Sequence, residues 1–253
     1  MRGDLNDINS IQQVVDGAEA VYLVTSVVGN TPDVETEQGK RAVDVLAKSP
    51  TLKHFIFSSL PSVSKLSGGK YNNVAHFESK ARIAEYIKTT YPELWAKTTE
   101  LWIAGYFQIW VQFPYIFSPQ KDENGTWVLR QPVDKDDYFP QVDVRDVGKV
   151  VRAILAKGTS KLGGKTVKFQ NKKLRTQSEI LNSWGAILGR NVEFRKISEK
   201  EFGERVVNMG LPEAMAIPIV EVVRFTAEFG ATALQDDGVI QSKDVRIFAT
   251  LPV

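Results

Sequence analysis

The sequence has 253 residues, of which 43% are hydrophobic and 25% are charged, and these proportions are typical of a globular α/β protein with one main domain. The 32 basic and 30 acidic residues are mixed along the chain and give a net charge of +2, which argues against a direct nucleic-acid partner. The absence of cysteine excludes disulfides, thiolate catalysis and thiolate-bound metals, and two histidines are too few for a histidine-rich metal site.

The first half of the chain alternates strand and helix patterns. Short apolar runs rich in β-forming residues predict strands at 20–25, 54–58 and 99–104. The first two are nearly continuous in apolar residues, which is typical of strands buried on both faces of a parallel sheet. Amphipathic helices are expected between them, at 34–47 and 77–88. This order predicts right-handed βαβ units and therefore an α/β fold.

Aromatic, hairpin and strand patterns follow in the middle of the chain. Residues 106–117 are unusually rich in aromatic side chains. Asn124-Gly125 predicts a hairpin turn before a short strand at 127–130. Asp143 is expected to cap a helix, and the alternation in 165–170 predicts a half-exposed strand.

The last third of the chain is predicted to be mainly helical. Capping residues and apolar spacing predict helices at 176–188, 198–209 and 212–229. We expect these helices to form a small lobe over the carboxyl edge of the sheet. The predicted organisation is a sheet core at 1–160 and an α-rich lobe at 161–253 that covers the substrate and does not fold by itself.

Five motifs occur in an order that is known from one protein family. They are Gly3-Asp4-Leu5-Asn6-Asp7, the run at 20–25, HFIFSSL at 54–60, His76-Phe77-Glu78-Ser79-Lys80, and Asp143-Val144-Arg145-Asp146-Val147-Gly148. Together they resemble the NmrA-like family, atypical relatives of the short-chain dehydrogenases and reductases. The resemblance implies a Rossmann-like parallel sheet, a small C-terminal lobe and a nicotinamide cofactor, NADP, at the strand ends. Some members are reductases, and others resemble redox sensors that contact a transcription factor.

The sequence departs from the family pattern at its start. In the family, a strand, a G-x-x-G-x-x-G turn, a helix and a second strand precede the motif that begins here at Gly3. We therefore expect a sheet that lacks its first βαβ unit. Because that turn cradles the pyrophosphate, its absence removes several hydrogen bonds of about 1.5–3 kcal/mol each and argues against tight NADP binding. The strand at 20–25 becomes an open edge, which favours a homodimer through that edge or indicates a truncated gene product.

Candidate cofactor-binding residues follow the predicted strands, where an open α/β sheet presents its ligand crevice. They are Asp4, Thr25, Ser26, Gly29, Ser58 and Lys80. By the resemblance, Asp4 lies near the adenine and Lys80 near the nicotinamide ribose. The alternative for Asp4 is a surface turn, and for the residues after the strands it is an ordinary polar loop.

Lys80, His76 and Tyr71 are the candidate catalytic residues. The resemblance extends to the short-chain reductases, in which a Y-x-x-x-K motif places a tyrosine acid one helical turn before a lysine. That lysine lowers the tyrosine pKa and holds the ribose. His76 takes the place of the tyrosine here, and an imidazole can move a proton near neutral pH. The alternative for His76 is a packed or capping residue. Tyr71, in the preceding loop, is a substitute proton donor.

Tyr106, Phe107 and Trp110 are the candidate substrate-pocket residues. They follow the third strand, where such folds place the substrate, and they suit a flat hydrophobic molecule. The alternative is core packing between the sheet and the lobe.

Three functions stay open at this point. The first is a reductase that uses NADPH or NADH on a small hydrophobic carbonyl or alkene. The second is a non-catalytic redox sensor or transcription regulator with a regulatory protein partner, which the missing tyrosine favours. The third is a cofactor-independent isomerase or cyclase. The N-terminus lacks a signal-peptide pattern and no apolar run spans a bilayer, so we expect a cytoplasmic or nuclear protein without membrane contact.

Overall fold

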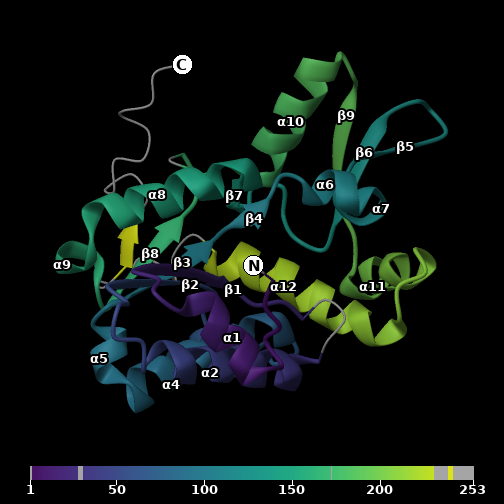
Figure 1. The fold of residues 1–253 in the computed structure, drawn as a ribbon. Coiled ribbons are helices and arrows are strands. Elements are labelled where there is room, and N and C mark those ends of the chain that lie inside the picture. The colour runs from purple at the N-terminus through teal and green to yellow at the C-terminus, as the bar shows by residue number, and fades with distance from the viewer. Residues whose placement is uncertain (1, 28–30, 172, 231–238, 242–253) are drawn as a thin grey trace.

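In the computed structural model of the protein, a parallel sheet lies between two layers of helices (Figure 1). The structure describes residues 2–27, 31–171, 173–230 and 239–241. The sheet has five strands, and every neighbouring pair is parallel. In spatial order the strands are β1 (Ala20–Val24), β2 (His54–Ser59), β3 (Thr98–Ile103), β8 (Lys165–Phe169) and β10 (Val239–Gln241). The predicted α/β fold with a parallel sheet is confirmed.

The interior strand β2 is buried on both faces because helices cover both sides of the sheet. Phe55 and Phe57 of β2 pack into the core on one face, and Ile56 packs into the core on the other. The first face is covered by α1 (Ile8–Val15), α2 (Pro32–Leu46), α4 (Ala75–Thr90) and α5 (Pro92–Trp95), which lie below the sheet in Figure 1. The second face is covered by α8 (Val147–Lys157) and α9 (Thr159–Leu162).

The remaining elements build the lobe at the carboxyl edge of the sheet and the links to it (Figure 1). The strands are β4 (Gly105–Tyr106) with β7 (Gln141–Val142), and β5 (Gln120–Lys121) with β6 (Trp127–Gln131) and β9 (Val192–Lys196). The helices are α3 (Val63–Leu66), α6 (Ile109–Gln112), α7 (Pro114–Phe117), α10 (Gln177–Leu188), α11 (Glu199–Asn208) and α12 (Ala216–Phe229), with 3-10 turns at Val144–Asp146 and Glu213–Met215. The predicted hairpin and the predicted caps are confirmed, since β5 pairs antiparallel with β6 and both Thr176 and Ser198 cap their helices.

The first strand is an open edge, as the missing βαβ unit predicts, and the burial on both faces that its apolar run alone indicates is not found. β1 pairs with β2, and no strand of the described residues lies on its other side. Its side chains alternate between exposed and half-buried, and Val24 is 54% exposed. An apolar run predicts a fully buried strand only where a further strand and helix cover it, and the described part of the chain supplies neither on this side.

The strand at β8 also differs from the prediction. Its alternating sequence predicts one exposed face, but the last three residues, including Lys168, are buried. The cause is α12, which passes over the carboxyl end of the sheet and covers the face that the pattern marks as polar (Figure 1). β8 follows the predicted boundary after residue 160 yet lies in the main sheet. The division into a core and a lobe stays a prediction.

Candidate functional site

Lys80 lies at the carboxyl end of β1, where three elements meet. Its ammonium donates a hydrogen bond of 3.0 Å to the carbonyl oxygen of Thr25, which follows β1. The same ammonium forms an ion pair with Glu35 in the first turn of α2. The side chain of Lys80 is 12% exposed and that of Glu35 is fully buried. A buried ion pair therefore fixes the position of Lys80 at the edge where parallel sheets bind ligands.

Close packing between α2 and α4 makes this contact possible. A Cβ atom on Gly39 of α2 would lie 2.3 Å from Cδ1 and 2.7 Å from Cγ1 of Ile83 on α4, so a larger residue there would force the Ile83 side chain to move. The hydroxyl of Ser79 donates to the second carboxylate oxygen of Glu35, so both oxygens have a partner. Ser79 and Lys80 together satisfy a carboxylate that lies in the core.

Glu35 is a site residue that the sequence reasoning missed. It lies on the buried side of α2 with Gly39, Ala42, Val43 and Leu46, spaced as one helical face. A carboxylate on an otherwise small and apolar helix face must find a cation, and that is the signal in the sequence that could have revealed it.

His76 lies one helical turn before Lys80 on α4 and is uncharged at neutral pH. Burial is the main cause that lowers its pKa to about 4, and the positive charge of Lys80 lowers it further. Its ring packs edge-on against Phe77, with 4.9 Å between the ring centroids. The predicted pairing of His76 and Lys80 on one helix face is thus present in the structure, but the imidazole holds no spare proton near pH 7.

Thr25 has a second feature besides its carbonyl contact. Its hydroxyl oxygen is buried, and no described residue forms a hydrogen bond with it. A buried hydroxyl without a partner costs about 1–3 kcal/mol, and a bound molecule with a polar group would remove that cost.

The two serines at the end of β2 face opposite sides of the sheet. Ser58 forms a hydrogen bond with Tyr22 of β1 that opposes the effect of burial, which raises the pKa of Tyr22. Ser59 donates 3.5 Å to the backbone carbonyl of Lys80. Ser58 therefore contacts the edge strand β1, whereas Ser59 contacts α4, the helix that carries Lys80.

The other predicted residues lie apart from this cluster or are not described. The carboxylate of Asp4 accepts hydrogen bonds from Asn6 and orders an exposed N-terminal turn. Gly29 lies outside the described residues, and Ser26 follows Thr25 in the loop after β1. The hydroxyl of Tyr71 donates 2.7 Å to Glu228 of α12, so it ties the loop to the lobe.

The aromatic segment lines an open cavity of about 680 Å³ between α6 and α10. Phe107 and Trp110 lie in its wall together with Trp184, and Arg175 and Lys173 add positive charge. Tyr106 is not among the lining residues; burial raises its pKa, and the nearby Tyr22 raises it further. Two of the three predicted pocket residues are thus brought together.

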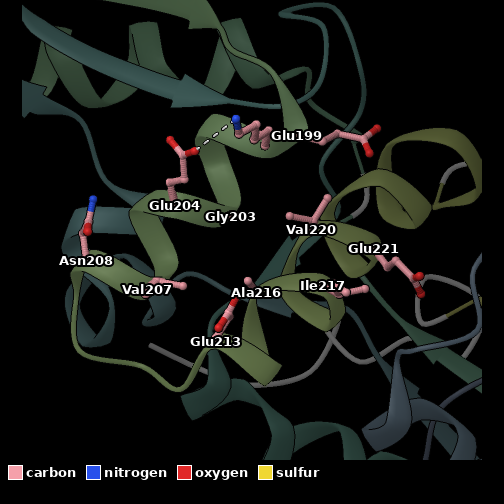
Figure 2. Close-up of a pocket in the computed structure, with 11 residues that line it drawn as sticks. Glu199, Gly203, Glu204, Val207, Asn208, Glu213, Ala216, Ile217, Val220 and Glu221 are labelled. Carbon is pink, nitrogen blue, oxygen red and sulfur yellow. Dashed lines mark ion pairs between the residues drawn. The ribbon is translucent and has the colours of Figure 1, made fainter.

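A second open groove lies between α11 and α12 (Figure 2). Val207, Ile217 and Val220 give it an apolar floor, and Ile217 is 60% exposed. Four glutamates and one lysine line it; they are Glu199, Glu204, Glu213, Glu221 and Lys200. The groove has a volume of about 740 Å³ and a net negative lining.

Two classes of feature are not found in the part of the chain that the structure describes. No helix there has the length and apolar character needed to cross a bilayer. No group of three or more metal-ligating side chains is found there either.

Comparison with known proteins identifies one family. The sequence model of the NmrA-like family matches residues 1–247. An NmrA-like family domain-containing protein of Dictyostelium discoideum is 29% identical over 202 residues, which cover 77% of this chain and 63% of that protein. The nitrogen metabolite repression protein nmrA of Emericella nidulans is 23% identical and is matched over 87% of this chain and 59% of its own length. The chain thus spans about three fifths of the length of these relatives.

Solved structures share the fold at low sequence identity. The negative transcriptional regulator NmrA in complex with NAD superposes with a TM-score of 0.74 at 19% identity, covering 100% of this chain and 77% of that one. The Citrobacter sp. triphenylmethane reductase complexed with NADP(H) gives a TM-score of 0.69 at 16% identity, covering 99% of this chain and 79% of that one. These matches confirm the Rossmann-type fold. The family model, which matches nearly the whole sequence, shows that the chain belongs to the NmrA-like family.

Proposed function

We propose that the protein is an oxidoreductase that uses NADPH or NADH on a small hydrophobic metabolite. The observation that carries this proposal is the ammonium of Lys80, which Glu35 and the Thr25 carbonyl hold at the carboxyl end of β1. In support, NmrA has been solved with NAD and with NADP, and the triphenylmethane reductase has been solved with NADP(H).

The residues at the end of β1 fit the ribose end of such a cofactor. The buried hydroxyl of Thr25, which has no partner among the described residues, matches a ribose hydroxyl in hydrogen-bonding character. Lys80 donates two contacts and retains a third N–H for the same sugar. When bound, the nicotinamide ring supplies the hydride.

His76 would not supply a proton, and it is not among the residues that line the cavity proposed below for the substrate. An imidazole with a pKa of about 4 is neutral at pH 7, so it offers one N–H donor and one acceptor but no extra proton. Glu35 acts through Lys80 and is a positioning residue. The proton that a reduced carbonyl requires would then come from solvent.

The cavity between α6 and α10 is the proposed substrate site. Its volume of about 680 Å³ is in the range of small-molecule sites, and Phe107, Trp110 and Trp184 provide flat apolar walls. Arg175 and Lys173 at the same cavity would favour a substrate that carries a polar or anionic group at one end.

The proposal is tested by titrating the protein with NADPH and with NADH and following tryptophan fluorescence and calorimetry. We expect saturable binding, and we expect Thr25→Val to weaken it at least tenfold without loss of stability, since valine is isosteric and removes an unpaired hydroxyl. Thr90→Val, at an exposed threonine, is the control for the same substitution away from the site. No binding at millimolar cofactor would contradict the oxidoreductase and redox-sensor functions together and leave a cofactor-independent isomerase or cyclase, or a regulator that acts through a protein partner.

A second candidate function is favoured by the groove between α11 and α12. An apolar floor with a negative lining suits a basic amphipathic helix of a protein partner, as a non-catalytic regulator would require (Figure 2). Fluorescence anisotropy with a labelled basic amphipathic peptide tests this. Binding that Ile217→Glu leaves unchanged would contradict it.

The open edge of β1 supports self-association. The backbone groups on its outer edge have no strand partner among the described residues, and together with the exposed Val24 they can pair with a second copy of the chain. Sedimentation velocity should detect a dimer, and Val24→Lys should shift it toward monomer. A wild-type protein that stays monomeric across the concentration range would contradict this proposal.

A further inference from the structure

Lys168 is a buried lysine that the proposed function does not use. It lies one residue before the end of β8 and is 2% exposed. In the sheet it pairs in register with Trp102 of β3. Its ammonium donates a hydrogen bond of 3.0 Å to the carbonyl oxygen of Gly230, at the end of α12.

The lysine borders a small cavity at the carboxyl ends of the central strands. The cavity measures about 70 Å³ and is only partly enclosed. Aromatic and aliphatic side chains make up most of its wall, among them Phe77, Trp102 and Phe225. These residues come from α4, β3 and α12, so the cavity lies between the sheet and the lobe.

The ammonium has no anionic partner among the described residues. The acidic residue on the same face of β3, Glu100, already accepts from Trp102 and Thr166 and pairs with Lys88. An ammonium has three donors, and one backbone carbonyl engages only one of them. Burial accordingly lowers the pKa of Lys168 to about 8.

We propose that this cavity binds the carboxylate group of a small organic acid and that Lys168 is its ion-pair partner. A buried charge without a partner is costly, and an anion is the ligand that removes this cost, whereas a neutral molecule of the same shape does not. A dry cavity of about 150 Å³ accommodates benzene, so about 70 Å³ holds a carboxylate with one or two carbons. Larger acids would enter by the carboxylate end through the open side. The inference goes beyond the oxidoreductase proposal and does not depend on the cofactor.

The test uses acetate and propionate, with acetamide as a neutral molecule of the same shape, added to the full chain without cofactor. Calorimetry at pH 7 should give one saturable site for the acids, with acetamide at least tenfold weaker. Lys168→Met should abolish this difference, and Lys165→Met, at an exposed position of the same strand, should retain it. Raising the pH above about 8 should weaken acid binding about tenfold per pH unit, because the free amine loses its charge.

A second measurement needs no variant and therefore does not depend on how Lys168→Met folds. Reductive methylation at pH 8, read by peptide mass spectrometry, reports the accessibility of each lysine. Propionate should protect Lys168 and leave Lys165 unprotected. Equal binding of acetate and acetamide, or equal labelling of Lys168 with and without propionate, would overturn the proposal.

Discussion

Lys80 and Lys168 are both largely buried near the carboxyl edge of the sheet, but their ammonium groups have different partners. Lys80 has a carboxylate partner, Glu35, which is itself satisfied by Ser79. Lys168 has only the backbone carbonyl of Gly230 among the described residues. The first arrangement neutralises its charge within the fold, and the second leaves a charge that a ligand can neutralise. Burial alone therefore does not distinguish a structural lysine from a binding lysine; the partner does.

The largest expected effect comes from breaking the paired site. Glu35→Ala leaves the Lys80 ammonium and the Ser79 hydroxyl without their shared acceptor in the core, which should cost about 3–5 kcal/mol of unfolding free energy. Urea unfolding followed by circular dichroism measures this. Glu37→Ala, two residues further along α2 and 56% exposed, is the matched control and should cost well under 1 kcal/mol. A similar loss for both variants would show that Glu35 is not a buried partner.

Removing both charges of the ion pair tests whether Glu35 and Lys80 stabilise each other. The double variant Glu35→Gln with Lys80→Met leaves no unpaired ion, so it should be more stable than the sum of the single variants implies by about 2 kcal/mol or more. A double-mutant cycle from urea unfolding gives this coupling energy directly. Additive losses would mean that the two side chains do not interact in solution.

The sequence predicts the strands and helices around these two lysines better than it predicts the contacts of the lysine side chains. The apolar runs at β2 and β3 and the cap at Thr176 rest on local patterns, and local patterns locate these elements correctly. The contact between Glu35 and Lys80 depends on how closely two helices pack, 45 residues apart in the chain, and no local pattern contains that distance. The motif around Lys80 can be recognised in the sequence, but its pairing with Glu35 cannot.

The two wrong burial predictions have a common physical cause. The sequence of β1 predicts burial and that of β8 predicts half exposure, and the structure reverses both because burial depends on neighbouring elements. An edge position exposes the apolar strand, and α12 covers the polar face that contains Lys168. A periodic pattern indicates the environment for which a strand is suited. The actual burial of the strand depends on the elements that pack against it.

The unpaired site should respond in the opposite direction to the paired one. At pH 7, Lys168→Met removes a buried charge and should stabilise the protein by about 2 kcal/mol, since lowering a lysine pKa from 10.5 to about 8 corresponds to about 3 kcal/mol and the Gly230 contact is lost. Between pH 8 and pH 10.5 the unfolded chain keeps the proton on Lys168 that the folded protein releases, so the free energy of unfolding of the wild-type protein rises with pH. The advantage of methionine should therefore be full below pH 8 and absent above about pH 10.5. Thermal unfolding across this range measures it, and a destabilised variant at pH 7 would contradict an unpaired charge.

The smallest effect is expected at the exposed counterpart of Glu35. Glu228 also binds a lysine and a hydroxyl, Lys70 and Tyr71, but it lies near the surface, where water can replace a lost partner. Tyr71→Phe removes one hydrogen bond and keeps the ring contact with Phe225, so it should cost about 1 kcal/mol. The same variant separates two roles of Tyr71. A proton donor would lose turnover with little change in stability, whereas a residue that ties the loop to α12 would lose stability and keep turnover. Since its hydroxyl already donates to Glu228, which also holds Arg224 on α12, we expect the second result.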